Sequence, residues 1–228
     1  MNSGFVMNTK KMIQKFLLRH GVVLTQVLRY LTRTRNIDLS AYAGDYVRNS
    51  SLELMAHEIN SRQLAGSVAE LGVYRGDFAK IMNEVFPDRK LYLFDTFQGF
   101  DARDVRIEQE QSYSSGDQEF SKTSIELVLG KMKYPENCIV KQGYFPDTAQ
   151  DVHDEFVFVS IDADLYKPIY DGLCYFYPKL VKGGCLFVHD YNNDEYQGAH
   201  DAVRQFCRDH DIGFFPLPDA CGTAVIIK

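Results

Sequence analysis

Short apolar blocks alternate with stretches of helical spacing along most of this chain. Continuous apolar runs bounded by turn residues are typical of buried strands, and longer stretches with a 3.6-residue period are typical of helices. We therefore predict strands at 67–71, 91–94, 138–141, 156–161, 185–188, 214–215 and 223–227, and helices at 77–85, 120–132, 168–180 and 198–210. The polar stretch 97–118 is predicted to be a long loop. Strands that alternate with helices predict an α/β fold whose largely parallel sheet is covered by helices on both faces.

The carboxyl ends of the predicted strands are the expected ligand site. In an open parallel sheet, ligands bind beyond these ends. The residues that follow the first five strands are Gly72, Asp95, Gly143, Asp162 and the pair His189 and Asp190. The sequence therefore predicts a binding site at this edge of the sheet before any motif is considered.

The composition is that of an ordinary globular protein. The chain has 228 residues, of which 45% are hydrophobic and 25% are charged, so one domain with a sizeable core is expected. No apolar run reaches the roughly 18 residues of a membrane-spanning helix. The net charge of −6 argues against a nucleic-acid-binding protein. Five cysteines without a CxxC pair argue against a disulfide framework or a zinc cluster, and favour a reducing, cytoplasmic location.

The first 37 residues differ from the rest in charge. They contain seven Lys or Arg and no acidic residue, which leaves 18 of the 25 basic residues against all 31 acidic residues in the remainder. Apolar groups at 16–18 and 22–24 predict one or two amphipathic helices interrupted near Gly21. Such a segment can pack as a lid or dimer helix, rest on an anionic membrane surface, or act as a targeting segment. We divide the chain into this basic N-terminal segment, 1–45, and a globular domain, 46–228.

The turn after the first strand indicates a cofactor. The stretch 70–76 reads ELGVYRG and places Gly72 and Gly76 where a strand turns into a helix, so that helix N–H groups can face an anionic ligand. The spacing differs from the GxGxxG of dinucleotide-binding folds, and a plain tight turn would explain it equally well. Asp95, at the end of the second strand, can accept hydrogen bonds from ribose hydroxyls. Together these residues predict an adenosyl ligand without a pyrophosphate.

The ends of the fourth and fifth strands indicate a metal. Asp162 and Asp164 stand two residues apart at one strand end, and His189 and Asp190 end the next strand. Oxygen-rich ligand sets suit Mg²⁺ or Ca²⁺ better than zinc. The alternative is that these carboxylates cap helices or face solvent.

Five motifs occur in an order that resembles the macrocin O-methyltransferase family, the class I S-adenosylmethionine-dependent sugar O-methyltransferases of antibiotic biosynthesis. They are ELGVYRG at 70–76, LFDTFQGF at 93–100, GYFPDT at 143–148, IDADLY at 161–166 and HDY at 189–191. The resemblance spans about 45–226. It implies a Rossmann-like, seven-stranded sheet with the last strand antiparallel, a bound S-adenosylmethionine and a Mg²⁺ ion, so that 46–228 is a methyltransferase domain.

The resemblance also implies roles for individual residues. The cofactor residues are Ser51, Glu70, Gly72, Val73, Tyr74, Gly76, Asp95, Gly143, Tyr144 and Phe145. Asp162, His189 and Asp190 match the metal ligands, and Asp164 matches the general base. His189 departs from the pattern, because many relatives have two acidic residues before the tyrosine. An imidazole is a softer ligand than a carboxylate, so Mn²⁺ becomes an alternative to Mg²⁺.

The expected activity is methyl transfer from S-adenosylmethionine to a hydroxyl of a sugar or glycoconjugate. Three alternatives remain: a catechol-type enzyme that methylates a phenol, a module that binds an adenosyl ligand without turnover, and a nicotinamide-dependent oxidoreductase, which the missing pyrophosphate glycines disfavour. Tyr113, Ser114 and Ser115 either shape a lid over the site or belong to a solvated loop. We expect a homo-oligomer that binds no nucleic acid, located in the cytoplasm with peripheral membrane contact through the basic N-terminal segment as an option.

Overall fold

The computed structural model of the chain describes residues 12–13, 16–17, 19 and 44–228. The chain divides into two units, Met1–Leu39 and Ser40–Lys228. In the first unit, the described positions 12–13 and 16–17 are helical. The expected amphipathic helices of the basic N-terminal segment otherwise lie outside the described residues.

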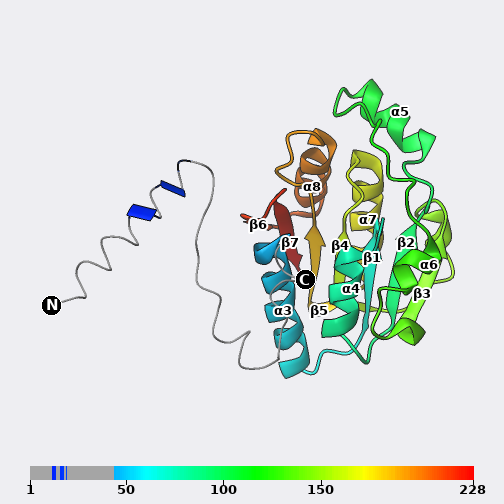
Figure 1. Cartoon of the computed structure of the whole chain (residues 1–228), viewed down its shortest axis with the longest axis vertical. Helices are drawn as coiled ribbons and strands as arrows, with labels where there is room; N and C mark the ends of the chain where they lie inside the picture. The colour runs from blue at the N-terminus through cyan, green and yellow to red at the C-terminus, as the bar shows by residue number, and fades with distance from the viewer. Residues whose placement is uncertain (1–11, 14–15, 18, 20–43) are drawn as a thin grey trace. The chain divides into compact units, whose positions relative to one another are not determined.

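The second unit is built on a seven-stranded sheet in the order β3-β2-β1-β4-β5-β7-β6 (Figure 1). The strands are β1 (Ser67–Leu71), β2 (Leu91–Asp95), β3 (Cys138–Gln142), β4 (Phe156–Ile161), β5 (Leu180–Val188), β6 (Phe215–Leu217) and β7 (Thr223–Ile227). β7 is antiparallel to both of its neighbours, β5 and β6, and every other pairing is parallel. The predicted α/β class and the antiparallel last strand are therefore confirmed.

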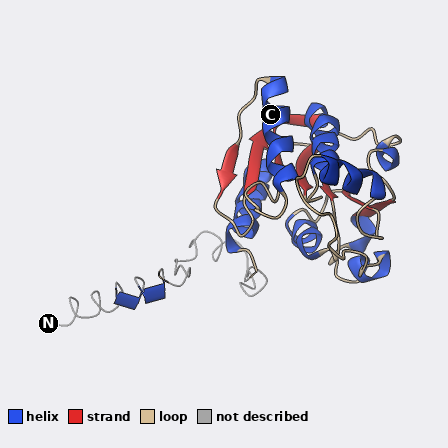
Figure 2. Ribbon diagram, turned by 90° about the horizontal axis from the view of Figure 1, so that it is seen from above, coloured by secondary structure: helices blue, strands red, loops and turns tan. Residues whose placement is uncertain are grey.

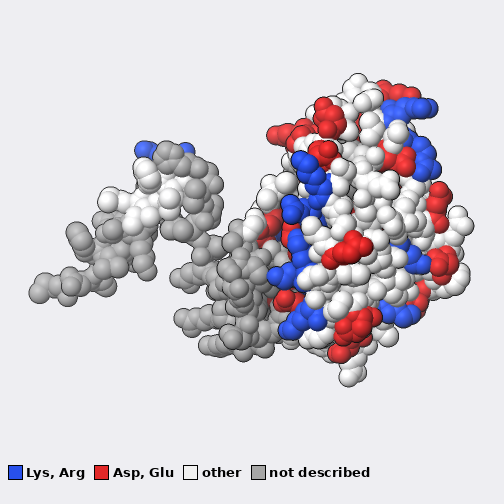
Figure 3. Space-filling model, turned by 45° about the vertical axis from the view of Figure 1, so that its right-hand side comes forward, with Lys and Arg blue, Asp and Glu red and all other residues white. Residues whose placement is uncertain are grey.

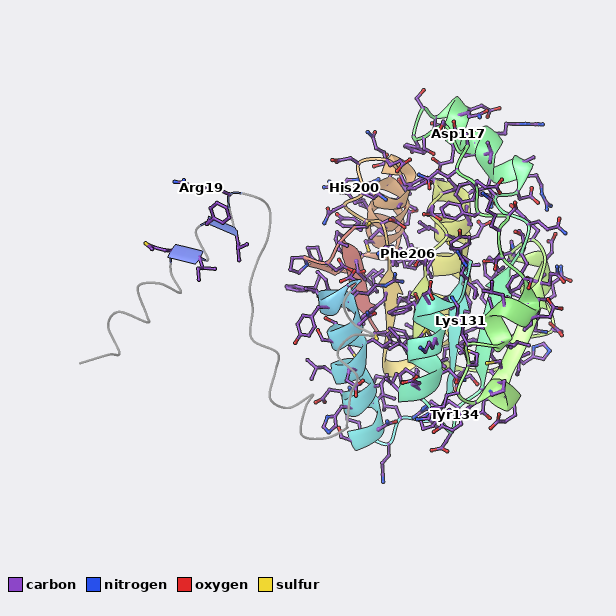
Figure 4. The ribbon with its side chains drawn as sticks, in the orientation of Figure 1. Arg19, Asp117, Lys131, Tyr134, His200 and Phe206 are labelled. Carbon is purple, nitrogen blue, oxygen red and sulfur yellow. The ribbon has the colours of Figure 1, made fainter. Side chains whose placement is uncertain are left out.

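Helices cover both faces of the sheet (Figure 2). The buried side chains of α3 (Tyr46–Ser61), α4 (Asp77–Val85) and α6 (Ile125–Leu129) belong to one hydrophobic cluster, and those of α7 (Tyr166–Lys179) and α8 (Gln197–His210) belong to another. Phe206 of α8, labelled in Figure 4, is fully buried and lies 5.5 Å from the Tyr177 ring of α7, measured between ring centroids. The apolar strands are thus buried from both sides, as a parallel sheet requires.

Two predicted elements need correction. The stretch 97–118 is not a loop throughout, because it contains α5 (Ala102–Glu110), which Asp101 caps by accepting a hydrogen bond from Arg103 N at 2.9 Å. This helix is strongly polar, so it lacks the apolar periodicity on which the prediction depended. The helix predicted at 120–132 is limited to α6, which Ser124 caps through Leu127 N.

Strand register brings the carboxyl ends of the central strands together. Leu71 pairs with Ile161, and Ile161 pairs with Val188, so β1, β4 and β5 end side by side. At Gly72, φ is +83° and an added Cβ would lie 1.9 Å from Asp162 O. Only glycine permits this approach, and the first strand end therefore sits directly against the predicted metal ligands.

The surface of the domain carries mixed charge. Basic and acidic side chains are interspersed over the face shown in Figure 3. Within the described part of the chain, no helix combines the length and the apolar character needed to cross a membrane.

Candidate active site

A cavity of about 440 Å³ lies at the carboxyl ends of the strands. Ten of the residues predicted from the sequence line it: Glu70, Gly72, Val73, Tyr74, Asp95, Gly143, Tyr144, Phe145, Asp162 and Asp164. Residues from the ends of four strands therefore meet in one cavity, as the fold predicts.

Two predicted cofactor residues lie beside this cavity rather than in its lining. Gly76 adopts φ +73° at the start of α4, and an added Cβ would lie 2.9 Å from Val128 Cγ1. Its role here is to start the helix and to pack against α6. Ser51 lies in α3, three residues after Arg48 and two after Asn49, and those two residues line the cavity in its place.

Asp95 accepts hydrogen bonds from the loops that follow β1 and β2. Its Oδ2 accepts hydrogen bonds from Val73 N at 2.7 Å and Tyr74 N at 2.8 Å, and its Oδ1 accepts one from Phe97 N at 2.6 Å. The carboxylate therefore holds the glycine turn against the end of β2. Its predicted contact with a ribose remains a prediction.

Helix α5, absent from the sequence prediction, forms a wall of the cavity beyond β3. The Tyr144 hydroxyl donates to Asp104 Oδ1 at 3.0 Å, and the Arg103 guanidinium carbon lies 3.4 Å from the centroid of the Tyr144 ring. Burial raises the pKa of Asp104 to about 6, although the hydrogen bond from Tyr144 opposes the shift. Asp117, labelled at the top of Figure 4, belongs to the loop that follows this helix.

Glu70 brings a buried carboxyl group to the cavity. Its side chain is 1% exposed, and its Oε2 has no hydrogen-bond partner among the described residues. Burial raises the pKa of Glu70 well above its usual range, and the neighbouring charge of Asp162 adds to this effect. An unpaired buried polar atom is costly, so this oxygen marks a position where a ligand donor would fit.

The four residues predicted to bind metal or act as base lie together. Asp162, Asp164 and Asp190 each place a carboxylate oxygen within 4.8 Å of the other two. His189 Nδ1 lies 3.1 Å from Asp162 Oδ1 and 3.1 Å from Asp190 Oδ2. Hard divalent cations prefer carboxylate oxygens, so these three carboxylates are suitable ligands for one. The imidazole of His189 adds a nitrogen beside Asp162 and Asp190.

Arg48 is a site residue that the sequence did not reveal. Its Nη1 donates to Asp162 Oδ2 at 2.9 Å and its Nη2 to Ser160 Oγ at 3.1 Å, while its guanidinium carbon lies 3.9 Å from the Phe78 ring centroid. The residue is buried in α3, and 114 positions separate it from Asp162. No local pattern marks it, because only the packing of α3 on the sheet brings it to the site.

The charges of the cluster balance one another. Burial alone would raise the pKa of Asp162, but the charges of Arg48 and His189 outweigh it and hold that pKa well below its usual range. Burial alone would lower the pKa of His189, but the charge of Asp162 raises it to about 10. Burial, with the charges of Asp190 and Asp162, raises the pKa of Asp164 well above its usual range. The mutual charges of these neighbouring groups therefore shift the pKa of Asp162 downward and the pKa values of His189 and Asp164 upward.

A known protein family matches most of this chain. The family model of the macrocin O-methyltransferases (TylF) matches residues 37–226. Demethyldecarbamoylnovobiocin O-methyltransferase of Streptomyces niveus is 26% identical over 180 residues, which are 68% of this chain and 66% of that protein. The chain thus matches just under two thirds of that relative's length.

Solved structures show the same fold. The O-methyltransferase NovP superposes with a TM-score of 0.65 at 20% identity over 79% of each chain. The calicheamicin methyltransferase CalS11 superposes with a TM-score of 0.64 at 19% identity, over 79% of this chain and 78% of that chain. TomG of Streptomyces achromogenes, solved in complex with S-adenosylmethionine, gives a TM-score of 0.51 at 13% identity over 78% of this chain and 80% of that chain.

Proposed function

The chain belongs to the macrocin O-methyltransferase family, and from this premise we propose that it transfers the methyl group of S-adenosylmethionine to a hydroxyl of a sugar or glycoconjugate. One observation carries the proposal. Glu70 and Asp95, the predicted cofactor residues, line the same cavity as Asp162 and Asp164, the predicted metal and base residues. A methyl donor and an acceptor hydroxyl must meet within about 3 Å, and a shared cavity allows this.

The cavity suits the two ends of S-adenosylmethionine. The unpartnered Oε2 of Glu70 can accept a hydrogen bond from the amino group of the methionine moiety. Tyr144 and Phe145 offer aromatic surface beyond β3, where the adenine would lie. A pyrophosphate would need a different glycine pattern, and this favours the methyl donor over a dinucleotide.

We infer that a divalent cation, Mg²⁺ in the first place and Mn²⁺ as the alternative, is held by Asp162, His189 and Asp190. The convergence of these side chains supports this assignment. When bound, such an ion would lower the pKa of the acceptor hydroxyl and orient it. Arg48 keeps one oxygen of Asp162 occupied and so limits how that carboxylate can turn.

Asp164 is proposed as the general base. It lines the cavity, and its backbone at φ +58° departs from the strand so that its carboxyl group comes within 4.8 Å of Asp162 and Asp190. A raised pKa makes a carboxylate a stronger base once it is ionised. The proton of the acceptor hydroxyl would therefore pass to a carboxylate Oδ of Asp164.

The proposed acceptor is a sugar hydroxyl. The Streptomyces niveus relative is named demethyldecarbamoylnovobiocin O-methyltransferase, and solved CalS11 is described as a TDP-rhamnose 3′-O-methyltransferase. The description of CalS11 supports a sugar hydroxyl over a phenol. The basic N-terminal segment would bring the enzyme to membrane-linked glycans, and self-association through the same segment is the alternative.

An acceptor screen tests the proposed function. The purified protein is incubated with S-adenosylmethionine, Mg²⁺ and matched panels of nucleotide sugars, glycosides and catechols, and S-adenosylhomocysteine release is followed with and without EDTA. We expect release with a sugar panel that EDTA abolishes. Turnover confined to catechols would contradict the sugar assignment, and turnover unchanged by EDTA would contradict the metal. If no panel reacts but calorimetry shows tight S-adenosylhomocysteine binding, the protein is a binding module.

A further inference from the structure

The loop that precedes β7 is fastened against the end of β5. Tyr191 N donates to Gly222 O at 2.9 Å, and Asn192 N donates to Cys221 O at 3.1 Å. Gly222 adopts φ +76°, and an added Cβ would lie 2.7 Å from Asn192 Cβ. Only glycine permits this approach. The backbone therefore fixes the position of the Cys221 thiol relative to the end of β5.

This loop completes a second group of metal-binding atoms. His189, Asp190 and Cys221 each place one ligand atom within 4.8 Å of the other two. Asp190 is buried, and the other two residues are half-buried. The group therefore lies below the surface and combines a nitrogen, an oxygen and a sulfur, whereas Asp162, Asp164 and Asp190 form a set of oxygens alone.

The two groups differ in the cation that they prefer. Carboxylate oxygens suit Mg²⁺, but a mixed set of imidazole, carboxylate and thiolate is typical of Zn²⁺ and other borderline-soft divalent ions. We propose that His189, Asp190 and Cys221 form a second cation site, specific for Zn²⁺ and other borderline-soft divalent ions. This site shares Asp190 with the carboxylate set of Asp162, Asp164 and Asp190. Binding would release the thiol proton of Cys221 and the proton on the ligating nitrogen of His189 to solvent, so that a thiolate and a neutral imidazole bind the cation.

The surroundings of His189 strengthen this proposal. Asp45 and Asp219 each place a carboxylate oxygen within 4.8 Å of a His189 nitrogen and of one another. The Oδ1 of Asp219 is buried and has no hydrogen-bond partner in the described part of the chain. A buried oxygen without a partner is costly, and a cation beside His189 would compensate it.

The second site has a consequence for methyl transfer, and this consequence rests on the proposed function. Asp190 belongs to both groups, and His189 is among the proposed Mg²⁺ ligands. A Zn²⁺ ion bound to Cys221 would also bind His189 and Asp190. These two residues could then no longer hold Mg²⁺ together with Asp162. Zn²⁺ is therefore an inhibitor that Mg²⁺ does not mimic.

Cobalt spectroscopy tests the site independently of activity. Co²⁺ is titrated into the reduced, full-length protein, and the near-ultraviolet charge-transfer absorption of a thiolate–Co²⁺ bond is recorded. We expect this band in the wild type and in Cys174→Ser, which removes an exposed cysteine, and its loss in Cys221→Ser. An absent band in the wild type at excess Co²⁺, or a band that persists in Cys221→Ser, would overturn the proposal.

A second measurement needs no variant. X-ray absorption of the wild type loaded with one equivalent of Zn²⁺ should show one sulfur neighbour at about 2.3 Å. A shell of nitrogen and oxygen alone would refute the site, even if Cys221→Ser failed to fold.

Inhibition by Zn²⁺ is then measured for each variant relative to the initial rate of the same variant without Zn²⁺. The Zn²⁺ concentration that halves the initial rate should rise at least about tenfold in Cys221→Ser and stay unchanged in Cys174→Ser. If the cobalt band behaves as expected but inhibition does not shift, the site exists and its effect on catalysis is refuted. If no acceptor reacts, the proposed function fails while the spectroscopic result stands.

Discussion

Arg48 Nη1 lies 2.9 Å from Asp162 Oδ2 and joins helix α3 to the end of strand β4. The side chains are 8% and 24% exposed, so the ion pair is largely removed from water. The pair holds the first helix of the domain against the centre of the proposed active site. The stability of the fold and the charge of the site therefore depend on the same contact.

Replacing Arg48 should destabilise the domain strongly. Arg48→Met leaves the buried Asp162 without its cation, and breaking a buried pair from one side typically costs about 3–5 kcal/mol. Urea unfolding followed by circular dichroism measures this change. Arg106→Met, which removes an exposed arginine of α5, is the control and should leave the midpoint nearly unchanged. Equal stability of Arg48→Met and the wild type would show that the ion pair makes no net contribution to the free energy of unfolding.

Asp164→Asn should abolish most of the activity without weakening cofactor binding. Loss of a general base typically lowers kcat by about 10²–10⁴. The amide retains the shape of the side chain, so S-adenosylhomocysteine affinity should stay within about twofold by calorimetry. A variant with more than half of the wild-type rate would remove Asp164 from the mechanism.

Asp95→Ala should weaken S-adenosylhomocysteine binding by at least about tenfold. The carboxylate accepts two backbone N–H bonds that order the turn at Val73 and Tyr74, and a third from Phe97. Hydrogen bonds to a charged group contribute roughly 1.5–3 kcal/mol each, so their loss should also lower Tm. Calorimetry and thermal unfolding measure both effects. Asp88→Ala, which removes an exposed carboxylate, is the control, and a variant that binds as tightly as this control would contradict the prediction.

Asp104→Asn should stabilise the protein at high pH but not at low pH. Burial raises the pKa of Asp104 to about 6. For a carboxyl group with a raised pKa, the stabilisation is complete below the unfolded-state pKa and is lost as the pH rises through the folded-state value. The wild type should therefore lose stability between about pH 4 and pH 7, whereas the amide does not titrate. The Tm difference between variant and wild type should grow from pH 4.5 to pH 8.

Asp101→Asn is the control for this pH dependence. The hydrogen bond from Arg103 lowers the pKa of Asp101. The stabilisation that the ionised Asp101 gives to the folded state is therefore complete above about pH 4. Its Tm difference should be constant from pH 4.5 to pH 8. A constant difference for Asp104→Asn as well would contradict the raised pKa.

His189→Asp should change which metal the enzyme uses. The substitution adds a hard oxygen ligand beside Asp162 and Asp190, so the Mg²⁺ concentration that gives half-maximal rate should fall about tenfold or more. The same change removes the nitrogen of the proposed zinc site, so Zn²⁺ sensitivity should also fall. Initial rates across Mg²⁺ and Zn²⁺ titrations measure both. An unchanged Mg²⁺ requirement would exclude His189 from the metal shell.

The strands and helices α4, α7 and α8 followed from local patterns, whereas α3 and α5 were not predicted. A buried strand needs a continuous apolar run, and β1 and β4 were predicted at their observed bounds. Helix α5 escaped prediction because its sequence is polar. Its fully buried Glu108 accepts hydrogen bonds from Tyr166 N and, at 3.0 Å, from Ser114 Oγ. These contacts tie the helix to α7, so its position depends on tertiary contacts rather than on apolar periodicity.

The sequence by itself determined which residues stand at the strand ends, because strand boundaries are set by local apolar runs and the turn residues that follow them. It thereby placed Glu70, Asp95 and the cluster of Asp162 and Asp190 at one edge of the sheet. Only the tertiary structure decided that Arg48 neutralises Asp162 and that Cys221 adjoins His189. Cysteine spacing alone argued against a zinc site, since no two cysteines are close in sequence. The first contact depends on the packing of α3 against the sheet and the second on strand order and register. Both bring together residues far apart in the chain, and no periodicity encodes them.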